Sequence, residues 1–285
     1  MPHTPARDGT RLYYEEAGQG SAVVFVHEYA ADYRTWEPQL RRFSRQYRCV
    51  TYSQRGYPPS DIPNDPDKYL QDLFRDDVIA LMDALKIDKA HVVGHSMGAA
   101  TALHVGIRYP QRCISVTAAG CGYGSSPDPK VVEESRAASR ETGKMFAAES
   151  MEVAGTRYAA GPTRQAQKNK DPRGYAQFVK MLTEHSALGH SLTMLNLQAK
   201  RPTLYEMEAE LKKFLPPLLI IVGDEDDWCL DASVYLRRTV PTAGLLVIPR
   251  SGHTITSEEP AAFNAAVAEL FAASEAGRWM AHKPA

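Results

Sequence analysis

The sequence lacks any apolar run of the roughly 18 residues that a membrane-spanning helix needs. Its first residues, 1–9, are polar and have no apolar core of the kind found in a secretory signal peptide. An excess of either charge is also missing, because 33 Lys and Arg stand against 34 Asp and Glu for a net charge of −1. Such a balance argues against nucleic acid as a partner. We therefore expect a cytoplasmic protein that binds neither membranes nor nucleic acid.

Cysteine is scarce, and the four cysteines are scattered without C-x-x-C spacing or a histidine-rich ligand pattern: Cys49, Cys113, Cys121 and Cys229. Isolated cysteines in a chain of this kind are typical of buried, reduced thiols. The sequence therefore predicts neither a disulfide framework nor a metal site. At 285 residues the chain is long enough to bury a sizeable core without such cross-links.

Short runs of strand-forming residues alternate with helical patterns through most of the chain. The runs that are typical of buried strands lie at 23–26, 49–52, 90–93, 113–117, 218–222 and 245–248. Residues 11–16 follow a turn and are predicted to form an antiparallel edge strand. This alternation predicts an α/β fold, with a mostly parallel, doubly wound sheet and helices on both faces.

The alternation stops between Ser125 and Phe214, where helical patterns continue without a buried strand. We expect residues 125–213 to form a helical cap, inserted between two parts of a core domain at 1–124 and 214–285. A basic stretch in this cap reads as a solvated face rather than an anion-binding surface. Its members are Arg157, Arg164, Lys168, Lys170 and Arg173. The tail beyond Ala276 is predicted to fray.

The segment Gly94-His95-Ser96-Met97-Gly98 lies where a predicted strand meets a predicted helix. A G-x-S-x-G sequence in this position places the serine on a sharp, strained turn, where glycines are needed because a Cβ would not fit. A serine hydroxyl is a poor nucleophile in neutral water, so it needs an imidazole to accept its proton and a carboxylate to orient that imidazole.

The imidazole and the carboxylate are expected where other strands end, because ligands of open α/β sheets bind beyond the carboxyl ends of the strands. His253 follows the last predicted strand, which sets it apart. Two other groups of histidines are expected to be solvated or structural: His3, His185, His190 and His282, and His91, His95 and His104 beside the Ser96 turn. An acidic cluster follows the strand at 218–222. Spacing alone leaves four carboxylates open: Asp224, Asp226, Asp227 and Asp231.

These segments, in the order Ser, Asp, His, resemble the α/β-hydrolase family, and the resemblance extends from Leu12 to Phe271. It implies a catalytic triad of Ser96, Asp226 and His253, because the family's G-D-x-D pattern has the triad acid at its second aspartate; Asp227 is the alternative. The residue after the nucleophile, Met97, is expected to supply one oxyanion-hole amide, and the resemblance assigns the other to Tyr29.

The resemblance implies a cofactor-independent hydrolase that cleaves a carboxylic ester or lactone through an acyl-enzyme, similar to enol-lactonases, cofactor-free haloperoxidases and small carboxylesterases. Its partner would be a small-molecule substrate, and a homodimer is left open. Serine at residue 96 argues against the haloalkane dehalogenase and epoxide hydrolase branches, which resemble the chain but require a carboxylate nucleophile. Meta-cleavage C–C hydrolases, which use the same triad, and a low-turnover binding protein on the same scaffold remain alternatives.

Two loops depart from the family pattern. His27-Glu28 stands where relatives usually have His-Gly, so a carboxylate is placed beside a site that stabilises negative charge. Residues 53–58 stand where relatives commonly show D-x-R-G-x-G. We predict that His27, Glu28, Trp36 and Tyr57 line the substrate pocket, with core packing as an equal alternative for Trp36.

Overall fold

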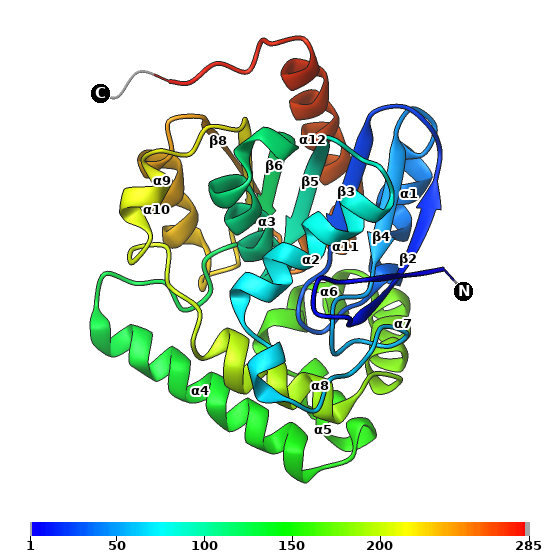
Figure 1. Ribbon diagram of the computed structural model, residues 1–285. Coiled ribbons are helices and arrows are strands. Elements are labelled where there is room, and N and C mark those ends of the chain that lie inside the picture. The colour runs from blue at the N-terminus through cyan, green and yellow to red at the C-terminus, as the bar shows by residue number, and fades with distance from the viewer. Residues whose placement is uncertain (1, 283–285) are drawn as a thin grey trace.

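The computed structural model describes residues 2–282, within which eight strands form one sheet in the order β1-β2-β4-β3-β5-β6-β7-β8 (Figure 1). The antiparallel part comprises β1 (His3–Pro5), β2 (Arg11–Ala17) and the pairing of β2 with β4 (Arg48–Tyr52). All other pairs are parallel and involve β4 and β3 (Ala22–Val26), β5 (Ala90–His95), β6 (Cys113–Ala119), β7 (Leu218–Gly223) and β8 (Ala243–Ile248). The predicted mostly parallel α/β fold is confirmed.

Helices cover both faces of this sheet, which is why β3, β5 and β7 are buried along their whole length. Side chains alternate between the faces: Val24 and Val26 join one hydrophobic cluster, while Val23 and Phe25 join another. The first cluster is covered by α2 (Gln71–Ala84), α3 (Met97–Arg108) and α10 (Leu230–Thr239). The second is covered by η1 (Tyr33–Trp36), α1 (Glu37–Phe43) and α12 (Pro260–Glu275). Short connecting helices are η2 (Pro66–Lys68), η3 (Pro110–Arg112) and α11 (Ile255–Glu258).

The chain between β6 and β7 is helical, and its helices gather below the sheet in Figure 1. They are α4 (Pro129–Ala148), α5 (Met151–Ala159), η4 (Pro162–Arg164), α6 (Gln165–Lys170), α7 (Pro172–Thr183), α8 (Ala187–Leu192), the π-helical η5 (Thr193–Gln198) and α9 (Glu208–Leu211). We call residues 129–211 the insertion. Its apolar side chains form a third buried cluster together with Tyr29 and Tyr57 of the sheet loops. The division into core and cap at residues 125 and 213 stays a prediction.

Two predictions about the ends of the chain are wrong. The strand at 11–16 is not the edge of the sheet, because the three residues of β1 pair outside it. The tail does not fray directly after Ala276: Trp279 Nε1 donates to Thr242 O over 2.7 Å, and His282 N donates to Pro241 O over 2.9 Å. Residues 283–285 of that tail lie outside the described residues. Among the helices that are described, none combines the length and the apolar character that crossing a bilayer requires.

Candidate active site

Ser96 occupies a sharp turn between β5 and α3. Its backbone has φ 52° and ψ −110°, a conformation with positive φ that side chains other than glycine rarely adopt. The turn is held because Ser96 N donates to Ala119 O over 2.7 Å. A Cβ on Gly94 would collide with the backbone of Gly98, and a Cβ on Gly98 would collide with the carbonyl of Val26. The two glycines are therefore a steric requirement of the turn, as the sequence predicts.

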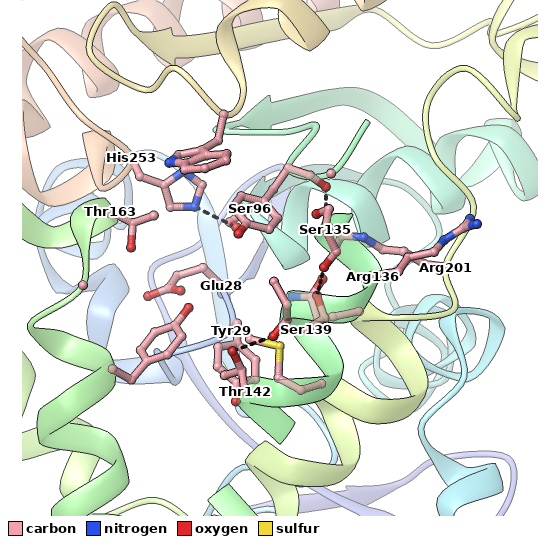
Figure 2. A pocket seen from close by; sticks show the side chains of 18 of the residues that line it. Glu28, Tyr29, Ser96, Ser135, Arg136, Ser139, Thr142, Thr163, Arg201 and His253 are labelled. Carbon is pink, nitrogen blue, oxygen red and sulfur yellow. Dashed lines mark hydrogen bonds between the residues drawn. The ribbon is translucent and has the colours of Figure 1, made fainter. Parts of the chain in front are cut away.

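Ser96, His253 and Asp226 form a hydrogen-bonded chain. Ser96 Oγ lies 2.9 Å from His253 Nε2, and His253 Nδ1 lies 2.8 Å from Asp226 Oδ2 (Figure 2 shows the first of these contacts). An ionised carboxylate can only accept, so Nδ1 donates to Asp226, which leaves the lone pair of Nε2 for the serine hydroxyl. This is the tautomer that a general base for Ser96 needs.

The structure distinguishes among the four acids that spacing left open. Asp226 is buried at the end of β7 and contacts His253, whereas Asp224, Asp227 and Asp231 are exposed. Burial alone would raise the pKa of Asp226, but the neighbouring His253 holds it below its ordinary value. Asp226 is therefore ionised at neutral pH, and it can stabilise an imidazolium on His253.

One group of described residues has ligand atoms close enough together to hold a metal ion. They lie within 4.8 Å of one another and belong to Asp226, Cys229 and His253. The atoms of this group already serve hydrogen bonds, since His253 Nδ1 lies 2.8 Å from Asp226 Oδ2. Burial raises the pKa of the Cys229 thiol well above its ordinary value. Its thiol donates to Gly120 O over 3.4 Å. The group fits a hydrogen-bonded triad with a neutral thiol beside it.

Met97 and Tyr29, whose amides are expected to bind an oxyanion, both lie at this site. Met97 is the first residue of α3, and the amides of a first helical turn have no acceptor within their helix. Tyr29 lines the same pocket as Ser96, and its hydroxyl donates to His190 O over 3.1 Å. The role of either amide in binding an oxyanion stays a prediction.

Glu28 lines the pocket as predicted, and both of its carboxylate oxygens accept hydrogen bonds. Oε2 accepts from Ala30 N over 2.8 Å, and Oε1 accepts from Nη2 of Arg164 over 2.6 Å. The two side chains are only 6% and 2% exposed. Burial alone would raise the pKa of Glu28, but Arg164, with His95 and the Ala30 amide, lowers it to about 2. Glu28 is therefore a carboxylate whose charge is neutralised before it can oppose an oxyanion.

The basic stretch of the insertion is exposed as its composition predicts at Arg157, Lys168, Lys170 and Arg173, and Arg164 is the exception. Arg164 is buried against the ring of Phe178, with its guanidinium carbon 4.5 Å from the ring centroid. Lys170 donates to Glu259 over 2.7 Å and to Ser251 Oγ over 3.2 Å. These cations bind the insertion to the loops that carry the site.

Three residues predicted to line the pocket do not line it. His27 links two loops by hydrogen bonds: its Nδ1 lies 2.7 Å from Glu28 O and its Nε2 accepts from Gln54 N over 3.0 Å. Tyr57 is fully buried, edge-on to the ring of His27. Trp36 packs in the core, its ring centroid 5.1 Å from that of Phe25. The pocket predictions for His27, Tyr57 and Trp36 are wrong, because apolar packing and hydrogen bonds to neighbouring loops occupy these side chains.

The pocket itself, about 290 Å³, is walled largely by the insertion. Figure 2 shows Ser135, Ser139 and Thr142 along α4, facing the space beside Ser96. The sequence pattern does not indicate this wall, nor Arg201, which follows η5. Polar residues on an amphipathic helix give the same pattern whether they face solvent or a pocket, so the sequence carried no signal that could have found them.

Comparisons with known proteins identify the family of this fold. A family model described as alpha/beta hydrolase fold matches residues 21–260. The 3-oxoadipate enol-lactonase 1 of Acinetobacter baylyi is 43% identical over 98 residues, which are 34% of this chain and 36% of that protein. An epoxide hydrolase of Caballeronia sordidicola is 33% identical over 137 residues, 48% of this chain and 42% of that protein. The chain thus matches less than half the length of either relative.

Solved structures resemble almost the whole chain. The enol-lactonase from Burkholderia xenovorans LB400 superposes with a TM-score of 0.80 and 22% identity, covering 95% of this chain and 100% of that one. A thermophilic esterase from Thermogutta terrifontis superposes with a TM-score of 0.84 and 21% identity, covering 96% and 99%. Identities this low show a shared fold.

Proposed function

The chain belongs to the alpha/beta hydrolase fold family, and from that premise we propose that it is a serine hydrolase that cleaves a carboxylic ester or lactone through an acyl-enzyme. The observation that carries the proposal is the hydrogen-bonded chain from Ser96 through His253 to Asp226. Serine at the strand-to-helix turn supports acyl transfer, as opposed to the carboxylate nucleophile that epoxide hydrolases require.

The chemistry starts with proton transfer from Ser96 Oγ to His253 Nε2 while the oxygen attacks the substrate carbonyl carbon. The electron pair of the C=O bond moves onto the carbonyl oxygen, where the amides of Met97 and Tyr29 would stabilise it. A well-placed donor of this kind is worth about 10²–10³ in turnover. The imidazolium of His253 faces the Asp226 carboxylate, which offsets its new charge.

Collapse of the tetrahedral intermediate breaks the bond to the leaving alcohol, and His253 Nε2 returns its proton to that oxygen. Water then attacks the acyl group on Ser96, with His253 again accepting a proton and afterwards returning it to the serine. In a lactone the leaving alcohol stays attached to the acyl chain, so the product is a single hydroxy acid, or its keto form when the alcohol is an enol.

A fluorophosphonate probe tests the proposal, because it reacts with an activated serine and adds a fixed mass. We expect intact-mass measurement to show one label on the native protein and none on Ser96→Ala. Ser135→Ala removes another hydroxyl from the same pocket and should label normally. An unlabelled native protein, or a label that persists in Ser96→Ala, contradicts the proposal. Esters of graded chain length and a set of lactones would then identify the scissile bond.

A further inference from the structure

We propose that the substrate carries a carboxylate group in addition to its scissile ester or lactone, and that Arg201 binds this group. The inference rests on the proposed hydrolysis at Ser96 and narrows its substrate class. Arg201 follows η5 and lines the pocket that also contains Ser96 and His253. Figure 2 shows it on the same side of the site as Ser135 and Arg136.

The hydrogen bonding of Arg201 is incomplete. Its Nη2 donates to Tyr123 O over 3.2 Å, while its Nη1 is enclosed and has no hydrogen-bond partner. An enclosed N–H without an acceptor is costly, and a cation is costlier still unless an anion pairs with it. A guanidinium stays charged in proteins, so it cannot escape this cost by losing its proton.

No carboxylate of residues 2–282 forms an ion pair with Arg201. The groups whose interactions favour its charge are two thiols and a phenol, of Cys121, Cys229 and Tyr123. All three are neutral at physiological pH, since burial raises each of their pKa values. The positive charge of Arg201 is therefore uncompensated within the pocket wall.

The other charged residues of the wall are already neutralised. Arg136 lies 3.0 Å from Glu206, and Arg157 lies 2.7 Å from Glu149. The single acid that lines the pocket, Glu28, is paired with Arg164 as described above. One cation is thus left over, and a singly charged carboxylate from the substrate would balance it.

The test compares two p-nitrophenyl esters that differ in one group: the monoester of adipic acid, and the ester of adipic acid monoamide. The first ends in a carboxylate and the second in a neutral carboxamide of nearly the same shape. A second pair, 4-carboxyphenyl acetate and 4-carbamoylphenyl acetate, places the same difference on the alcohol side. For the native protein we expect kcat/KM to favour the anionic member of one pair.

The decisive variant is Arg201→Gln, which keeps an N–H donor and removes the charge. We expect the anionic-to-neutral ratio of kcat/KM to fall by about 10–100-fold, the usual range for a charge-assisted hydrogen bond, while the neutral ester is cleaved at nearly the native rate. Lys200→Gln is the matched control: it removes a neighbouring, exposed charge that contacts Asn196, and it should leave the ratio unchanged.

Equal losses of kcat/KM for both esters in Arg201→Gln would mean that Arg201 acts on the triad through Cys229, and they would overturn the proposal. Native kcat/KM values for both esters in this variant would overturn it as well. A native protein that cleaves neither ester and takes no fluorophosphonate label would instead overturn the proposed function. If Arg201→Gln does not fold, inhibition of the native protein decides: adipate should inhibit ester cleavage about tenfold more tightly than adipamide, and equal inhibition contradicts the proposal.

Discussion

Replacing Arg164 by methionine should leave Glu28 as a buried carboxylate without a cation. Burying a charge in this way is strongly destabilising, by about 3–5 kcal/mol when one member of a buried pair is removed. The structure gives an independent figure. A Glu28 pKa of about 2 in the folded protein, against an ordinary 4.5, corresponds to about 3 kcal/mol of stabilisation. Arg164 is the foremost of the groups that lower this pKa, and His95, the Ala30 amide and His253 lower it as well.

A double-mutant cycle measures the part that belongs to the pair. Urea unfolding at pH 7 of Arg164→Met, Glu28→Gln and the double variant should give a coupling free energy of about 2–3 kcal/mol, because the double variant leaves no unpaired charge. A coupling below about 0.5 kcal/mol, as found for exposed ion pairs, would refute the argument that burial makes this pair strong.

The ion pair between Glu28 and Arg164 also makes the stability of the folded protein depend on pH. The folded protein holds the pKa of Glu28 below its unfolded value, so the stabilisation is fully present above pH 4.5 and is lost as the pH falls towards 2. The native protein should therefore lose about 2 kcal/mol more stability between pH 7 and pH 3 than the double variant does. Equal losses over this interval would show that Glu28 has an ordinary pKa.

Three further substitutions test the site and the fold. Asp226→Asn should lower turnover by about 10⁴ with the fold intact, whereas Asp227→Asn, on an exposed side chain, should leave ester cleavage unchanged; the reverse result would reassign the acid. Gly98→Ala forces a backbone collision beside the nucleophile and should cost at least about 10² in turnover, while Ala100→Gly in the same helix should cost only about 1 kcal/mol of stability. Trp36→Ala should lower the free energy of unfolding by about 3–5 kcal/mol and leave the kcat/KM of the folded protein unchanged; a selective loss of substrate binding would return Trp36 to the pocket.

The parts of the fold that the sequence predicts are those with a strong local signal. A run such as residues 218–222 is apolar at every position, which is typical of a strand covered on both faces, and the structure has β7 there. The short β1 was missed because its three residues, His3–Pro5, carry no such pattern. The sheet holds it through pairing with β2, which is a tertiary effect.

Some residues of the candidate site can be predicted from local sequence motifs, whereas others are identified only by their contacts in the folded protein. Ser96 and His253 follow from motifs that lie at strand ends, and spacing alone could not choose Asp226 because all four acids follow β7 within one short segment. In the structure Asp226 is buried and contacts His253, which favours it as the acid of the proposed triad. Arg164 could not be recognised from sequence, since its partner Glu28 is 136 residues away and a lone arginine among other basic residues is typical of a solvated face.

The positive φ at Ser96 sets activity against stability at a single residue. Holding a side chain other than glycine in this conformation costs about 1–3 kcal/mol, and the proposed role of the Ser96 hydroxyl as nucleophile accounts for a serine at this position. Glycine would occupy the same backbone without that cost. A Ser96→Gly protein should therefore be inert yet melt at a higher temperature than the native one. In a duplicated copy of such a chain that is no longer selected for turnover, this single substitution would give a more stable scaffold that can still bind a ligand.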